Sequence, residues 1–380
     1  MVRRNTLYAL SSAAMALPVF AAPQPAESVL SIRFSQYDES SLAKEDVLTG
    51  SEDRYDIDIG QFRLVTPAGR HWSLSLDASR ETMSGASPWG TFYGFGGEPN
   101  LVMTGATIRD ARTEVRIGGT YHGDSQSYSL GVTTSEEDDY ESLAIDLGGE
   151  WDFNGALSTL SAGLSFASDD LSPTEALMFG RIPKASRKSR SASVSWSQII
   201  NAGAVLQAGL SLTEHEGYLS DPYKLRDVRP DRRVEWALSL KYRRFFDNQN
   251  AALHLDYRYY DDDWGIESHT MDLAWHQNLG ASFQLVPRTR YYSQSESGFY
   301  VDADDYTLPP TDNQSSDFRL SGYGAWSVGL KAIYRGVSWS ANVSVDRYRA
   351  DSSYGHAGSR LEHPALLEFT LTAVGLDFVF

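Results

Sequence analysis

Hydrophobic and polar residues alternate along much of the chain. In "LHLDYRYYDDDWG" (residues 253–265), leucines and tyrosines hold the odd positions up to Tyr259, and His254, Asp256 and Arg258 stand between them. A period of two places successive side chains on opposite faces of a β-strand. Such a strand has one apolar face and one charged face. It suits either the core of a soluble sheet or a barrel with lipid outside and water inside.

Sixteen segments carry this alternation, so the sequence predicts an all-β protein. The predicted strands cover residues 28–37, 54–66, 71–82, 108–122, 125–136, 140–153, 158–168, 190–200, 203–215, 231–247, 250–262, 266–279, 281–295, 316–335, 336–350 and 365–380. An even number of strands is typical of bacterial antiparallel barrels.

The connections between the predicted strands alternate between short and long. Short ones such as "HGDS" (122–125) have the Gly, Asn and Asp chemistry of tight hairpin turns. Most of the others are long, such as 83–107 and 216–230, with short exceptions at 136–140 and 261–266. We therefore predict a single antiparallel transmembrane β-barrel of about 16 strands, with short periplasmic turns and long external loops.

The first residues predict export. Arg3 and Arg4 precede an apolar stretch and then small residues, which is the pattern of a secretory signal peptide. This predicts a signal peptide over 1–21 and an outer-membrane barrel over 22–380. No later apolar run approaches the roughly 20 residues that a spanning helix needs.

The composition of the chain excludes several kinds of site and makes nucleic-acid binding unfavourable. The chain has 380 residues, a formal net charge of −17 and no cysteine. The lack of cysteine excludes disulfides, thiolate metal sites and covalently attached c-type haem. An acidic chain of this kind is a poor nucleic-acid binder. The expected surroundings are instead outer-membrane lipid and lipopolysaccharide.

The last residues carry a further signal. Val374, Leu376, Phe378 and Phe380 occupy alternate positions. This ending resembles the one that outer-membrane barrels commonly present to the barrel-assembly machinery, and it implies that Phe380 contacts that machinery. The alternative is a buried last strand of a soluble sheet.

Six runs between residues 51 and 321 carry a family resemblance. They are "SEDRYDIDIGQFRLVTP" (51–67), "MSGASPW" (83–89), "GYLSDPYK" (217–224), "LDYRYYDDDWGIESHT" (255–270), "RYYSQSESGFY" (290–300) and "DFRLS" (317–321). Together they resemble an uncharacterised Gram-negative outer-membrane family, domain of unknown function 3570. The resemblance implies a β-barrel with no established activity and gives no catalytic residue to carry over. Relatives tend to be encoded near periplasmic redox proteins and flavin-attaching enzymes, which implies a possible periplasmic partner.

Ionisable residues of both signs crowd the inward positions of the C-terminal half. They are Arg233, Glu235, Lys241, Arg243, His254, Asp256, Arg258, Asp272, Arg288, Arg290, Asp317 and Arg319. These are candidate pore-lining or constriction residues, because rings of charged side chains set selectivity in channels. The interleaved signs also favour cross-strand pairs that hold the barrel together, each contributing roughly 0.2–1 kcal/mol.

Acidic clusters recur outside or at the ends of the strands, at Glu136–Asp139, Asp169–Asp170, Asp261–Asp263 and Asp302–Asp305. Oxygen-rich clusters suit Ca²⁺ or Mg²⁺. None has the spacing of a calcium-binding loop with a bidentate glutamate, so solvated loops are the simpler interpretation. We expect no metal site from the sequence.

One short motif suggests a cofactor. The run "ETMSGAS" (81–87) resembles the pattern at which flavin transferases link FMN to a hydroxyl, and Ser87 would be the acceptor. The match departs at Glu81, where such motifs usually have Asp, and Pro88 follows directly. The alternative is a small-residue turn at the external rim, and apart from FMN at Ser87 no cofactor is expected.

Hydrolase chemistry is the least supported possibility. His254, His269 and His276 lie on neighbouring predicted strands, with Ser268 and Ser293 nearby. A Ser/His pair of this kind serves as nucleophile and base in other enzymes. No G-x-S-x-G or H-E-x-x-H motif accompanies it, so we expect no enzyme.

The sequence predicts a porin-like channel for passive passage of small polar solutes. Sixteen strands are enough for a water-filled pore, and the loops 83–107 and 216–230 would fold inward to set its width. The alternative is a loop-plugged structural or docking barrel for periplasmic redox or other envelope partners. An outer-membrane hydrolase is third.

Overall fold

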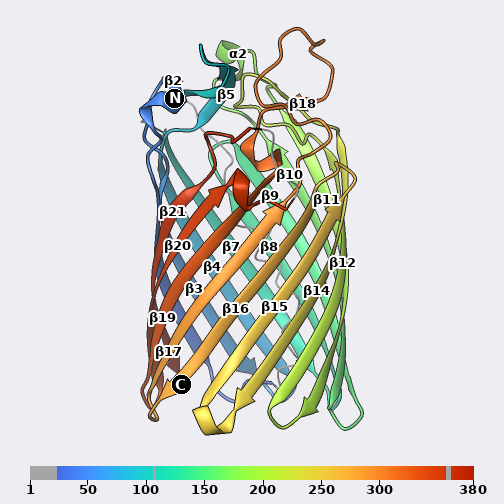
Figure 1. Ribbon diagram of the computed structural model, residues 1–380. Helices are drawn as coiled ribbons and strands as arrows, with labels where there is room; N and C mark the ends of the chain where they lie inside the picture. Colours follow the sequence, from blue (N-terminus) through green and yellow to red (C-terminus); the bar gives the residue numbers. More distant parts are fainter. Residues whose placement is uncertain (1–23, 106–107, 357–360) are drawn as a thin grey trace.

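A closed antiparallel barrel of sixteen strands forms the body of the protein (Figure 1). The computed structural model describes residues 24–105, 108–356 and 361–380. The barrel strands are β1 (Val29–Glu39), β3 (Asp56–Ala68), β4 (Trp72–Gly85), β7 (Ile108–His122), β8 (Gln126–Glu136), β9 (Tyr140–Phe153), β10 (Ser158–Leu171), β11 (Ala185–Asn201), β12 (Ala204–Gly217), β14 (Arg232–Phe246), β15 (Ala251–Asp262), β16 (Glu267–Leu279), β17 (Phe283–Gln294), β19 (Tyr323–Arg335), β20 (Trp339–Asp351) and β21 (Glu368–Val379). Each pairs with its neighbours in chain order, and β1 pairs with β21 to close the barrel.

The all-β fold and the sixteen barrel strands predicted from the sequence are confirmed. Most strand bounds agree within a few residues, and the main exception is β19, which begins at Tyr323 instead of residue 316. Residues 318–320 form the short 3-10 helix η3 (Phe318–Leu320), and the Asp317 side chain accepts a hydrogen bond from the Arg319 N–H at its start. Phe318 and Leu320 alternate with charged residues as the apolar positions of a wall strand would. Both side chains are nevertheless buried in a loop and lie outside the barrel wall.

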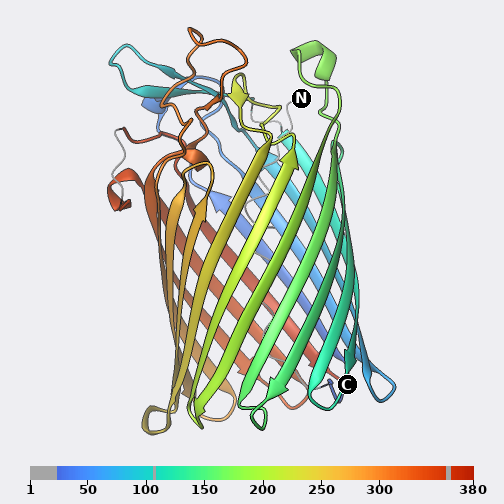
Figure 2. The same cartoon turned by 90° about the vertical axis from the view of Figure 1, so that its right-hand side faces the viewer.

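The two ends of the barrel differ as the sequence predicts. Short turns join the strands at the end where the C-terminus lies, and the long connections gather at the other end (Figures 1 and 2). At the short-turn end, the Ser28 N–H donates to the Phe380 carbonyl oxygen at 2.8 Å. We name the short-turn end periplasmic and the other end external. The predicted signal peptide lies outside the described residues.

Large apolar side chains cover the outside of the barrel. On β9, Leu143, Ile145 and Leu147 are exposed, and Asp146 between them faces inward, where it pairs with Arg116 of β7. An apolar band this extensive would be unfavourable in water, and it suits a lipid environment. In the part of the chain that the structure describes, no helix is long and apolar enough to cross a membrane.

The outward position of Leu147 gives a direct test of this assignment. Leu147→Arg is expected to destabilise the folded barrel by about 2–4 kcal/mol, because it puts a cation near mid-strand on the lipid face. The inward Ser165, which lies opposite Asp146 in the register, is the control. Ser165→Arg should change the free energy of unfolding much less. Urea unfolding in lipid vesicles measures both, and equal costs would contradict the assignment.

The external connections carry small structures that the alternation does not predict. β2 (Val47–Thr49), β5 (Pro88–Tyr93) and β6 (Pro99–Met103) form a three-stranded sheet, and β13 (Asp227–Val228) pairs with β18 (Gln314–Ser315). Short helical turns are η1 (Lys44–Asp46), α2 (Ala176–Phe179), η2 (Asp247–Gln249) and η4 (Ser352–Tyr354). η2 lies in a periplasmic turn, and the other elements lie in the external connections.

Candidate functional site: a charged lumen beneath an external plug

Ion pairs line the barrel interior in the C-terminal half. The Arg243 guanidinium donates to Asp256 at 2.9 Å, and Arg290 lies 3.4 Å from Asp272. Arg288 reaches Asp346 on β20 with an Nε–Oδ1 distance of 2.6 Å. The sequence predicts cross-strand pairing here without fixing the partners. Asp346 was not among the candidates.

A matching set of pairs lines the N-terminal half, where the sequence analysis named no candidates. Arg63 lies 3.5 Å from Asp77, which also faces Arg116 at 4.0 Å. Arg116 in turn donates to Asp146 at 2.6 Å. We call the ion pairs of both halves the lumenal charge lining.

Two glycines let ion pairs reach across a whole strand. Gly131 on β8 lies between Arg116 and Asp146, and a Cβ there would overlap both side chains. Gly329 on β19 lies in register between Arg288 and Asp346, and a Cβ there would overlap the Asp346 carboxylate. The close approach therefore requires glycine at both positions.

Solvent reaches the lumenal charge lining. The side chains of Arg63, Arg290 and Asp272 are 62%, 55% and 41% exposed, although all three point into the barrel. A barrel of sixteen strands is wide enough to hold water inside. The middle of the lumen is therefore wet.

The remaining strand candidates also lie on inward positions. Lys241 stands opposite Asp256 in the register, and the ring of His254 lies against His276 with 4.0 Å between centroids. The Arg258 guanidinium lies 5.2 Å from the centre of the Tyr260 ring.

Arg233 and Glu235 lie near the external end of β14. The Arg233 Nε donates to Asp262 at 2.9 Å, and its guanidinium lies over Trp264. Glu235 accepts a hydrogen bond from the Tyr260 hydroxyl at 2.8 Å. These two residues belong to a packed rim and not to the wet middle of the lumen.

Apolar side chains from several loops pack together at the external mouth. One cluster joins Ala86, Leu101 and Met103 from the β4–β7 connection to Phe318 and Ala365. In a second cluster, Leu320 packs against inward-facing wall residues that include Ala237 and Tyr260. We call residues 86–103, 218–231 and 314–321 together the external plug. Parts of the loops 83–107 and 216–230, which the sequence predicts to fold inward, pack at this mouth together with a third loop.

Asp317 and Arg319 belong to the external plug and not to the strand on which the sequence analysis placed them. The Arg319 Nε donates to Asp317 at 2.9 Å, and Arg229 donates to the same carboxylate at 2.8 Å. Lys224 lies 3.7 Å away. Burial alone would raise the pKa of Asp317, but Arg319 and then Lys224 hold it well below its usual value. This cluster joins the β12–β14 loop to the β17–β19 loop.

A neutral histidine ties a further loop to the plug. Burial, and then the charge of Lys224, lower the pKa of His363 to about 3. Its Nδ1 accepts from the Ala365 N–H at 3.0 Å, so the proton is on Nε2, which donates to the Ser316 carbonyl oxygen at 2.9 Å. The β20–β21 loop is thereby fixed against residue 316.

Ser87, the candidate flavin acceptor, lies inside the plug. The residue is 1% exposed, and its N–H donates to the Thr104 hydroxyl at 3.0 Å. A transferase would have to modify this hydroxyl before the loop packs, so the folded barrel gives the FMN hypothesis no support.

A serine and a histidine do meet on the outward side of the barrel near the external rim. His269 stands opposite Ser293 in the register, and the Ser293 hydroxyl lies 2.5 Å from Nδ1 of His356 in the β20–β21 loop. The His356 N–H donates to the same hydroxyl at 2.8 Å, and Ser293 is fully buried. The contact anchors the β20–β21 loop to β17.

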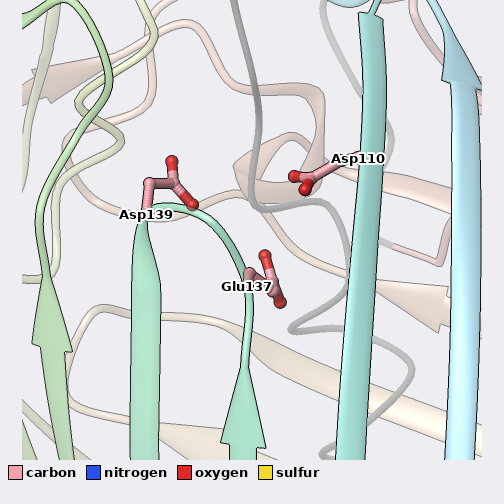
Figure 3. Close-up of side chains that lie close together, drawn as sticks. All are labelled: Asp110, Glu137 and Asp139. Carbon is pink, nitrogen blue, oxygen red and sulfur yellow. The ribbon is translucent and has the colours of Figure 1, made fainter.

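Two acidic features at the external end involve acidic clusters that the sequence predicts to be solvated loops. A cavity of about 540 Å³ is lined by Tyr93, Glu296, Tyr300, Val301, Asp302, Ala303, Asp304, Asp305 and Thr307. Separately, carboxylate oxygens of Asp110, Glu137 and Asp139 lie within 4.8 Å of one another (Figure 3). The cavity includes the whole run Asp302–Asp305, and the carboxylate group joins two residues of the run Glu136–Asp139 to Asp110.

Solved structures similar to this chain share its fold. A bacterial polysaccharide outer membrane secretin superposes with a TM-score of 0.52 at 10% identity, covering 93% of this chain and 98% of that one. CdiB from Acinetobacter baumannii gives 0.52 at 9% identity, covering 94% of this chain and 60% of that one. At these identities the likeness concerns the fold alone.

Family comparison extends over most of the sequence. No curated protein matches the chain. The family described as "Protein of unknown function (DUF3570)" matches residues 7–366, which include every barrel strand except β21. The resemblance found from the six sequence runs is confirmed, and the chain belongs to the DUF3570 family.

Proposed function

We propose that the protein is an outer-membrane channel for small polar solutes, with an external mouth that the plug closes at rest. The observation that carries this proposal is the solvent-exposed lumenal charge lining beneath the plug. A wet interior with charges of both signs suits small polar solutes better than apolar ones. The interleaved signs argue against strong selectivity for anions or for cations.

The proposed location is the outer membrane of a Gram-negative cell, reached by way of the predicted signal peptide. The apolar outer band would contact membrane lipid and lipopolysaccharide, and Phe380 would contact the barrel-assembly machinery. Antiparallel barrels with short turns at one end and long loops at the other are typical of this membrane.

The buried plug favours a second candidate function. Leu101, Phe318 and Asp317 are almost completely buried, as in the core of a folded domain. A barrel sealed in this way would serve as a structural or docking unit for a periplasmic redox protein or another envelope partner. The two candidates differ in whether the plug opens.

Single-channel conductance in a planar bilayer tests the proposal. The refolded wild-type protein is expected to show rare openings whose size grows with salt, because the plug must loosen before ions enter the wet lumen. Asp317→Ala, which weakens the plug, should open far more often. If both proteins fold but stay silent, the channel proposal fails and the docking barrel becomes the better explanation.

A further inference from the structure

Three carboxylates converge at the external end of neighbouring strands. Asp110 lies near the start of β7, and Glu137 and Asp139 lie in the turn between β8 and β9. Figure 3 shows the three side chains around one small space. One oxygen from each lies within 4.8 Å of the others.

The tight turn explains why only part of the acidic run "EEDD" faces inward. The Glu137 N–H donates to the Tyr140 carbonyl oxygen at 2.7 Å, which closes a four-residue turn. Strand alternation then sends Glu136 outward, where it is exposed, and Glu137 inward. Glu136 and Glu137 are therefore chemically identical neighbours in opposite surroundings.

The convergent carboxylates are buried. The Glu137 side chain is 5% exposed, and Asp110 and Asp139 are buried as whole residues. Burying several like charges together is costly unless a counter-charge compensates them.

The described groups around Glu137 compensate its charge incompletely. Arg112 lies 3.9 Å from Glu137, but it already donates to Glu114 at 2.5 Å and to Ser135 at 2.8 Å. Within the described part of the chain, Glu137 Oε2 is buried and has no hydrogen-bond donor. The same holds for Oε2 of Glu81 on the adjacent β4. Two buried carboxylate oxygens thus lack a donor beside the cluster.

We propose that Asp110, Glu137 and Asp139 bind a hard divalent cation, Ca²⁺ in the first place. Calcium takes carboxylate oxygens at about 2.3–2.6 Å, so opposite ligands stand about 4.8 Å apart. The three oxygens lie within that span of one another. Mg²⁺ usually keeps several waters and takes one or two carboxylates, so a set of three carboxylates favours Ca²⁺. Water completes the coordination.

The ion strengthens an existing link to the external plug. The Tyr223 hydroxyl donates to the Asp139 carboxylate, and the Tyr223 N–H donates to Asp221 at 3.0 Å within the β12–β14 loop. A cation held by Asp139 therefore fixes the β8–β9 turn under that loop. The site itself does not depend on the proposed channel function, because binding is measured without conductance.

Calorimetric titration with CaCl₂ tests the site. The refolded full-length barrel is stripped with EDTA and exchanged into a zwitterionic detergent, which removes lipopolysaccharide as a competing binder. Wild type and the control Glu136→Gln are expected to bind one Ca²⁺ per chain. Glu137→Gln and Asp139→Asn should weaken binding at least tenfold, and Mg²⁺ should bind wild type more weakly.

Folding of each variant is checked by heat-modifiable migration on gels, and Asp110→Asn replaces any variant that does not fold. The proposal is overturned if wild type binds no Ca²⁺ at millimolar concentration. It is also overturned if Glu136→Gln weakens binding as much as Glu137→Gln, since that result indicates diffuse binding to surface charges. Neither outcome bears on whether the barrel conducts.

Discussion

Asp317→Ala is expected to release the external plug while leaving the barrel folded. The carboxylate is fully buried and accepts from Arg229 and Arg319, with Lys224 nearby. Without this carboxylate, the positive charges of Lys224, Arg229 and Arg319 lie close together and are no longer fully compensated. Breaking a buried ion pair in this way costs about 3–5 kcal/mol. The cost falls on the plug, because Asp317 lies outside the barrel strands.

Limited trypsin digestion and conductance measure the result. Trypsin should cut the 218–231 segment of Asp317→Ala at least tenfold faster than wild type, and channel openings should become frequent. The control is Glu368→Gln, since the Arg347–Glu368 pair is 50% and 39% exposed. Exposed pairs contribute about 0–1 kcal/mol, so this variant should resemble wild type. An Asp317→Ala barrel that digests and conducts like wild type would refute the role given to the charge cluster.

Gly85→Ala is expected to have an effect of similar size on the packing at the top of β3 and β4. Gly85 has φ +136°, and a Cβ there would lie closer than 3.0 Å to the Arg54 carbonyl oxygen. An unfavourable φ alone costs about 1–3 kcal/mol. The overlap adds to this cost because the Cβ would meet backbone atoms of Arg54, which cannot rotate away as the end of a side chain can. Arg54 and the adjacent buried Tyr55 would be displaced together with the loop that starts at residue 86.

Gly69→Ala separates the cost of a positive φ from the cost of the overlap with the Arg54 backbone. Gly69 has φ +76° in a periplasmic turn, and a Cβ there would meet nothing within 4 Å. This control therefore carries the conformational cost without the overlap. Urea unfolding and the yield of heat-modifiable barrel should be affected much more strongly in Gly85→Ala. Equal losses in the two variants would show that the close approach to Arg54 is unimportant.

The barrel could be predicted from the sequence because its determinants are local. Alternation of Leu143, Ile145 and Leu147 with polar residues is visible within one strand, and the turn residues are visible beside it. Residues 316–322 were assigned wrongly for the same reason. Phe318 and Leu320 alternate with charges as a wall strand would, but they bury against loops instead of facing lipid.

The plug and the carboxylate cluster could not be predicted because their contacts are distant in sequence. β13 pairs with β18 only because the barrel brings the two loops together at one mouth. Asp110 meets Glu137 across adjacent strands, whereas the sequence shows only the continuous run Glu136–Asp139. The prediction of Asp317 and Arg319 as lumenal residues of a strand was wrong, because they lie in the loop before β19.

Gly131 and Gly329 constrain how this barrel can diverge among its relatives. Each ion pair crosses its strand where the glycine has no side chain, because a Cβ there would overlap the paired groups. A side chain at either glycine would displace the pair across it, so Gly131 should be retained wherever Arg116 and Asp146 are paired, and Gly329 wherever Arg288 and Asp346 are paired. Relatives with a larger residue at either position are expected to have lost the ion pair across it.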